Sequence, residues 1–135
     1  HFKMILDDFI TWHTKIAPEI QDVMSLMGTK LDKEPEGLIN DLMVIETWNS
    51  RMGELLAEAN GFLDKAKGEL MPDKEMGTEM VRKASLDAQV APLRVVRDKL
   101  ESICDCIKQR LIMGESILSF HKQFPERKAR EILEF

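Results

Sequence analysis

The chain has 135 residues, of which 44% are hydrophobic and 32% charged; Tyr is absent and the net charge is −5. Chains of this length ordinarily form one domain, so we expect a single helical domain over residues 1–135. Strand-forming residues are sparse, and no apolar run approaches the roughly 20 residues that a membrane-spanning helix needs. We therefore predict an all-α protein that makes no contact with a membrane.

The charge is unevenly distributed along the chain. Residues 1–77 hold 8 basic and 15 acidic residues, a net charge of −7, and residues 78–135 hold 11 and 9, a net charge of +2. The acidic part argues against nucleic-acid binding by the whole surface, whereas the other part leaves a local basic site open.

The first predicted element is an N-terminal helix over about residues 3–28. Its apolar residues recur at spacings of three and four, as expected for one helix face: Ile5, Phe9, Trp12, Ile16, Ile20, Val23 and Met27. Pro18 lies inside this stretch. Because proline lacks a backbone N–H and clashes with the preceding turn, we expect the helix either to kink there or to restart with Pro18 in its first turn.

Two longer stretches, about residues 36–70 and 78–122, carry the same apolar spacing over a greater length. The connector between them is short, so the two helices are expected to fold back as a long antiparallel hairpin that resembles a coiled coil. The residues expected in the seam between them, which also form the candidate oligomer surface, are Ile45, Trp48, Met52, Leu55, Phe62, Leu100, Ile103, Ile107 and Leu111.

Several residues mark where these helices begin, end or bend. Pro35 suits the first turn of the first long helix, and Thr78 is the predicted N-cap of the second. Pro92 lies inside the second and is expected to kink or break it. After Pro125, a short C-terminal helix is predicted over residues 126–134.

Apolar helix faces of this length require other helices to cover them. A hairpin about 50 Å long with one added helix leaves a large apolar area exposed if the chain is monomeric. We therefore expect a homo-oligomer, in which the helix over 3–28 packs across the hairpin or exchanges with a neighbouring copy.

Residues suited to catalysis do not form a recognisable motif. None of the three histidines, His1, His13 and His121, has a Glu three or four residues away in a metal-binding pattern. Cys104 and Cys106 are two apart in a helix and would point in different directions, so we interpret them as reduced thiols, which suits a cytoplasmic protein. We predict no enzyme activity, no cofactor and no metal site.

One enzyme class remains as an alternative, the all-α magnesium-dependent nucleoside triphosphate pyrophosphatases. Glu54 and Glu58 lie four apart on one helix face, and Asp98 with Glu101 could face them from the next helix. That family uses Glu-x-x-Glu followed downstream by Glu-x-x-Asp, and this chain has neither at the right place. Alternation with Lys and Arg is also typical of a solvated helix face.

Basic residues gather in the second long helix, and several lie off its apolar stripe, where they could contact the phosphates of an extended strand. The candidate nucleic-acid-binding residues are Arg94, Arg97, Lys108, Arg110 and Lys122. No aromatic residue lies among residues 81–119, so platforms for base stacking are missing. The alternative is a solvated face on which these cations pair with Asp98, Glu101 and Asp105.

Six short segments of the two long helices carry a resemblance to a known family. They are Trp48–Arg51, Leu63–Lys67, Thr78–Glu79, Arg82–Ala84, Arg97–Glu101 and Ile107–Arg110. This layout, with Ile-Lys-x-Arg late in the second helix, is similar to the recombination mediators of T4-like bacteriophages, the UvsY family, over roughly residues 38–120. The resemblance implies ring-like oligomers that bind single-stranded DNA and help to load a recombinase onto strands covered by single-strand-binding protein. It would place Lys108 and Arg110 in contact with DNA.

Three functional hypotheses follow. The first is a non-enzymatic, self-associating accessory protein of bacteriophage type, with single-stranded DNA and recombination proteins as its partners. The second is a protein–protein adaptor or assembly factor that does not bind nucleic acid. The third is the magnesium-dependent hydrolase.

Overall fold

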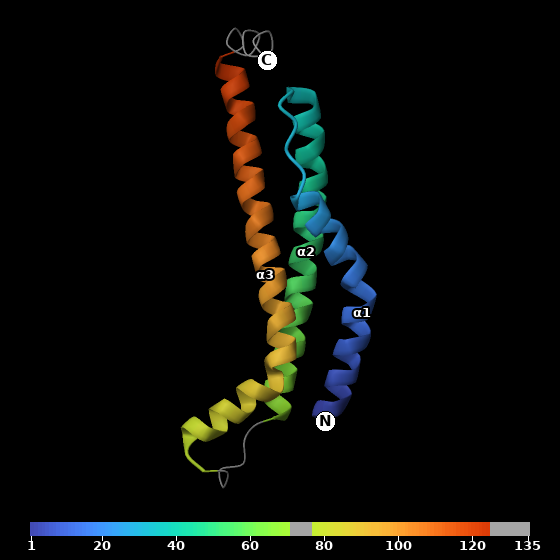
Figure 1. Cartoon of the computed structure of the whole chain (residues 1–135), viewed down its shortest axis with the longest axis vertical. Helices are drawn as coiled ribbons and strands as arrows, with labels where there is room; N and C mark the ends of the chain where they lie inside the picture. The colour runs from blue at the N-terminus through green and yellow to red at the C-terminus, as the bar shows by residue number, and fades with distance from the viewer. Residues whose placement is uncertain (71–76, 125–135) are drawn as a thin grey trace.

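A computed structural model describes residues 1–70 and 77–124, and these form three helices (Figure 1): α1 (Phe2–Met27), α2 (Pro35–Glu69) and α3 (Glu79–Gln123). No strand occurs within these two ranges, so the predicted all-α class is confirmed, and each helix begins and ends within one residue of its predicted bounds. In the described ranges, none of the three helices combines the length and the apolar character that spanning a bilayer requires. The helix predicted over 126–134 lies outside the described residues.

Local sequence determines where the long helices begin. Pro35 occupies the first turn of α2, where its missing N–H costs no helical hydrogen bond. The Thr78 hydroxyl accepts a hydrogen bond from the Val81 N–H at 3.3 Å, and Glu79 lies in the first turn, near the positive end of the helix dipole. Gly77 has a φ of +93°, a conformation that favours glycine, and it turns the chain into α3.

Both internal prolines lie within continuous helices, Pro18 in α1 and Pro92 in α3. The chain therefore neither restarts at Pro18 nor breaks at Pro92. Both prolines are exposed, so the carbonyl groups that lose a hydrogen-bond partner lie on the solvent side of each helix. In Figure 1 the yellow first turns of α3 leave the line of the remaining helix, as expected for a bend close to a proline.

The seam between α2 and α3 forms the core of the molecule. The two helices lie side by side and antiparallel (Figure 1), and the largest fully buried side chains come mainly from them. Of the nine predicted seam residues, six are buried: Ile45, Met52, Leu55, Leu100, Ile103 and Ile107. Trp48, Phe62 and Leu111 are half-buried and pack against the edge of this core, and Leu63 is buried beside Phe62.

The third helix, α1, packs on the hairpin of its own chain. Ile16, Ile20 and Val23 belong to one hydrophobic cluster with the middle of the seam, and Phe9 belongs to a second cluster with the start of α3 and the end of α2. Trp12 contacts both clusters. In Figure 1, α1 accompanies the lower part of the hairpin, and only the connector to α2 continues upwards.

Gly114 lets α2 and α3 approach each other closely. It is buried, and a Cβ atom added there would clash with Leu42 Cδ2 and lie 3.1 Å from Leu42 Cγ. By contrast, a Cβ atom added at Gly61 of α2 would meet nothing within 4 Å. The two glycines therefore differ: close packing of α2 against α3 requires glycine at position 114, whereas a larger residue fits at position 61.

Replacing Leu55 by Asp is expected to abolish the folded state at neutral pH. The change places an unpaired carboxylate in the seam, at a cost comparable with the whole free energy of unfolding of a small domain, about 5–15 kcal/mol. The milder Leu55→Ala is expected to cost about 2–5 kcal/mol. Thermal unfolding followed by circular dichroism measures both, with Ser50→Asp on the exposed side of α2 as the control. A wild-type melting temperature for Leu55→Asp would show that the helix pairing is wrong.

The two glycines predict opposite effects of alanine. Gly61→Ala is expected to raise the free energy of unfolding by about 0.5–1 kcal/mol, because alanine favours the helix and nothing obstructs its methyl group. Gly114→Ala is expected to lower it by about 1–3 kcal/mol, because Leu42 must move. Urea denaturation measures both values. Adding Leu42→Ala to Gly114→Ala should recover part of the loss, and equal stabilisation by both glycine changes would contradict the close approach.

Candidate functional site

Two of the five candidate nucleic-acid-binding residues pair with carboxylates on their own helix. Arg94 Nη2 lies 3.1 Å from Asp87 Oδ1. Arg97 Nε lies 2.6 Å from Asp98 Oδ1 and 4.0 Å from Glu101 Oε2. Pairing of this kind offsets the charge of each guanidinium group and occupies donors that a phosphate would need.

Arg110 makes a contact across the bundle. Its Nη1 donates to the carbonyl oxygen of Met27 at 2.9 Å, and its Nη2 donates to that of Thr29 at 2.7 Å. Met27 ends α1, where carbonyl groups lack helical partners and the helix dipole favours a cation. Arg110 therefore holds the end of α1 against α3, and these two donors are not free for DNA.

Lys108 and Lys122 are exposed, and with Arg94 they lie fourteen residues apart on one face of α3. Acidic residues occupy the intermediate positions on that face, so the charge changes sign at every seventh residue. We call this row the charge ladder, and it consists of Asp87, Arg94, Glu101, Lys108, Glu115 and Lys122. An alternating row offers a polyanion no continuous positive surface.

The charge ladder lies on the side of the hairpin away from α1. Arg110, which contacts α1, is two residues from Lys108, and residues two apart in an α-helix lie about 200° apart around its axis. The same holds on α2, where Arg51 contacts Glu19 of α1 and Gly53 is exposed with open space beside it. No helix of the described chain covers this side.

A groove of about 500 Å³ opens at one end of this uncovered side. Pro35, Ile39 and Leu118 line it, together with the ladder residues Glu115 and Lys122. Further along the hairpin, other leucines are half-buried at spacings that place them on the same side: Leu42, Leu56 and Leu111. We call this surface the open face, meaning the side of the hairpin that carries these leucines, the groove and the charge ladder.

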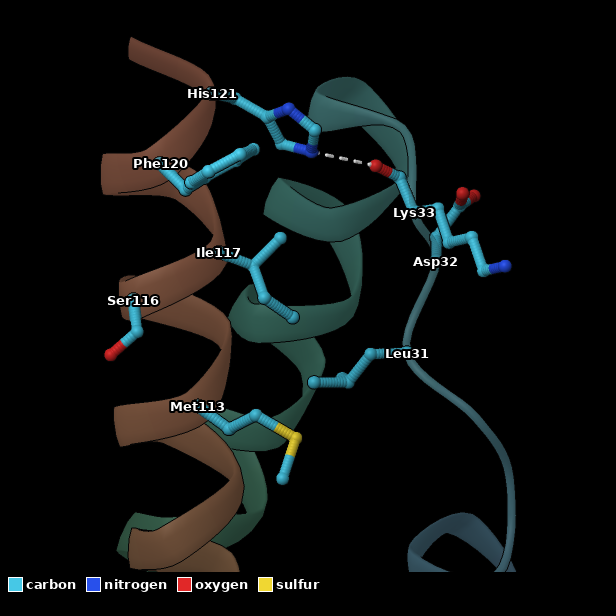
Figure 2. A pocket seen from close by; sticks show the side chains of 8 residues that line it. All are labelled: Leu31, Asp32, Lys33, Met113, Ser116, Ile117, Phe120 and His121. Atoms are coloured by element: carbon cyan, nitrogen blue, oxygen red, sulfur yellow. Dashed lines mark hydrogen bonds between the residues drawn. The ribbon is translucent and has the colours of Figure 1, made fainter. Parts of the chain in front are cut away.

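A second groove, of about 550 Å³, lies between the upper end of α3 and the connector from α1 to α2. Figure 2 shows Met113, Ile117 and Phe120 directed towards the connector, with Leu31 opposite. The His121 Nε2–H donates to the carbonyl oxygen of Lys33 at 3.0 Å, which ties the connector to α3. The connector therefore partly closes this groove, whereas none of the described segments closes the open face in this way.

The four carboxylates of the hydrolase alternative do not form one site. Glu58 accepts a hydrogen bond from the indole N–H of Trp12, and Glu54 lies 3.0 Å from Arg51 Nη1. Asp98 and Glu101 face Arg97, as described above. Among the residues that the structure describes, no group of three or more His, Cys, Asp or Glu side chains could hold a metal ion.

The two thiols lie in different surroundings and form no disulfide. Cys104 is buried in the seam, and this burial raises the pKa of its thiol; Lys108 opposes the shift, and Asp105 and Glu101 add to it. Cys104 therefore stays protonated at neutral pH and acts as a small apolar residue. Cys106 is exposed.

The best-defined polar contact between helices joins α1 to α2. Arg51 Nε and Nη2 donate to the two carboxylate oxygens of Glu19 at 2.7 and 2.9 Å, and Arg51 Nη1 donates to Glu54 at 3.0 Å. The two hydrogen bonds from Arg51 to Glu19 are the main reason that the pKa of Glu19 lies below its usual value. Partial burial raises this pKa, and the positive charges of Arg51 and Lys15 lower it further. Conversely, the two carboxylates raise the pKa of Arg51.

The chain was compared with family models, curated proteins and solved structures, and none of the three comparisons gives a match. The resemblance to bacteriophage recombination mediators therefore stays a prediction. The charge ladder is visible in the sequence as a seven-residue alternation, but only the position of α1 shows that it borders a surface that no described helix covers.

Replacing Glu19 by Gln is expected to destabilise the protein in a pH-dependent way. Because the folded-state pKa of Glu19 is lowered, its contribution is fully present above the ordinary value of 4.5 and is lost as the pH falls through the folded-state pKa. Both side chains are about a third exposed, 37% for Arg51 and 34% for Glu19. The expected loss at neutral pH is therefore only about 0.5–1 kcal/mol.

Urea denaturation of wild type and Glu19→Gln at a series of pH values measures this effect. The difference between them should shrink as the pH falls from 7 to below 4.5. Glu54→Gln is the matched control, since Glu54 is 66% exposed and makes one bond to the same arginine, so its effect should be smaller. A difference that does not change with pH would contradict the role given to the Glu19 carboxylate.

Proposed function

We propose that this protein is a non-enzymatic, self-associating helical module that acts in the cytoplasm as a protein–protein adaptor or assembly factor. The observation that carries this proposal is the open face, where half-buried leucines and an apolar groove lie beside α2 and α3 with no described helix over them. A surface of this kind, apolar in the centre and charged at the rim, has the composition of a protein interface.

The charges of α3 support a protein partner over a nucleic acid. Arg94 and Arg97 face carboxylates, Arg110 donates to backbone carbonyls, and Lys108 and Lys122 alternate with acidic residues. Single-stranded DNA would require a groove of one sign with aromatic residues for base stacking. The recombination-mediator hypothesis therefore depends on the family resemblance, without support from the arrangement of these side chains.

A pair of solution measurements tests the proposal. Sedimentation equilibrium should give a mass above the 15.5 kDa of one chain. Fluorescence anisotropy of a labelled single-stranded oligonucleotide should show no binding at physiological salt, where even non-specific DNA-binding proteins reach dissociation constants of about 10⁻⁴–10⁻⁶ M.

The opposite results identify the competing function. Binding that weakens linearly on a log–log salt plot, and that Lys108→Gln combined with Lys122→Gln reduces, would favour DNA as the partner. Lys30→Gln combined with Lys65→Gln is the matched control, since it removes the same charge from exposed positions outside α3. A monomeric mass at all concentrations would refute self-association.

A further inference from the structure

The charge ladder is complementary in charge to a second copy of itself when that copy runs in the opposite direction. Positive and negative residues alternate at every seventh position, so the row is its own complement when it is reversed and matched about its centre. Two such rows in antiparallel orientation would place Arg94 opposite the partner's Glu115, and Glu101 opposite the partner's Lys108. Two-fold symmetry repeats each pair. Every residue of the ladder, which we call a rung, therefore lies opposite a rung of the other sign.

The same row excludes the parallel arrangement in register. There, each residue would lie opposite its own copy, with Lys108 facing the partner's Lys108 and Glu101 facing the partner's Glu101. Like charges at the rim of an interface oppose association and select between orientations. Among arrangements with two-fold symmetry the ladder therefore favours the antiparallel one, and the match of all six residues sets its position.

The centre of the ladder lies in the straight part of the hairpin. It falls between Cys104 and Asp105, beyond the Pro92 bend, and the four rungs from Arg94 to Glu115 surround it symmetrically. The outermost rung, Asp87, precedes the bend and already pairs with Arg94 of its own chain. Arg94 is engaged in that same pair, so the inner pair of residues, Glu101 and Lys108, carries most of the specificity.

The neighbouring surface of α2 fits a second copy at the same level. Leu42 packs against Gly114, which fixes the register of the hairpin and places the centre of the ladder near Met52 and Gly53. A Cβ atom at Gly53 would meet nothing within 4 Å, so two α2 helices can approach each other there. Asn60, one heptad later, adds no charge to the row.

From these observations we propose that the partner on the open face is a second copy of this chain. The two α3 helices lie antiparallel, the two α2 helices lie antiparallel beside them, and the four form a bundle with a two-fold axis near Gly53 and Cys104. Leu42, Leu56 and Leu118 supply the apolar contact, and the ladder sets the orientation. This inference rests on the self-association proposed above and names its interface.

Charge reversal at one rung tests the arrangement. Glu101→Lys creates a row in which the residues at 101 and 108 are both positive, and Lys108→Glu creates one in which both are negative. Each variant alone should form a dimer about tenfold weaker than wild type at low salt, because two attractive pairs become repulsive. An equimolar mixture of the two variants should associate as tightly as wild type, since every positive rung then meets a negative one.

Sedimentation equilibrium of each variant and of the mixture measures these constants, and circular dichroism checks that each is folded. Asp22→Lys is the matched control, because it makes the same change of charge at an exposed position of α1 and should associate like wild type. Both reversed side chains are exposed, so neither change disturbs the seam.

The outcomes separate this inference from the proposal on which it rests. A monomeric wild type overturns both. An oligomeric wild type whose association is unchanged by either reversal, or is not restored in the mixture, overturns the antiparallel α3 interface and leaves self-association standing. Weakening of the same size in Asp22→Lys would show that net charge, rather than the ladder, controls association, and would also overturn the interface.

Discussion

The rest of the structure depends on one constraint, the burial of a long apolar seam between only two helices. A pair of packed helices has two open sides, and each exposes the flanks of the seam to water unless something covers it. The 26 residues of α1 extend about 39 Å and the 35 of α2 about 52 Å, so a single copy of α1 covers one side for part of its length. Among the described helices no second one is left for the other side, which therefore stays uncovered by them.

Polar contacts decide which side α1 occupies. The apolar stripe of α1 would suit either side of the hairpin, because hydrophobic burial has little directional preference. Arg51 with Glu19, Trp12 with Glu58, and Arg110 with the end of α1 are directional, and all three lie on the same side. Two residues from these anchors, after Arg51 at Gly53 and before Arg110 at Lys108, each long helix presents its other side, where the described residues make no such contact.

The local features of the fold follow from the sequence, whereas the long-range ones do not. Apolar spacing, Pro35 and Thr78 predict each helix to within one residue, since the forces that set helix ends act over a few residues. Apolar spacing alone does not decide whether Phe62 or Leu63 is buried in the seam, because the two are adjacent near the edge of the apolar stripe. In the structure the packing of the helices buries Leu63. Arg110 donates to the carbonyl oxygen of a residue 83 positions away, a contact that sequence patterns do not reveal. From the sequence alone, its positive charge therefore predicts contact with DNA.

The distance over which exposed charges act also determines which partners the charges of α3 can recognise. Fields from exposed charges are screened over roughly 8–10 Å at physiological salt, and rungs seven residues apart are separated by a similar distance, about 10 Å. Seen from farther away, positive and negative rungs therefore cancel, and a polyanion gains little from approaching the row. At contact distance each rung acts separately, so the pattern distinguishes only a surface with matching spacing. An antiparallel copy of α3 has that spacing because it is the same helix. The number of basic residues in α3 therefore favours a nucleic acid as the partner, whereas their order along the helix favours a second copy of this chain.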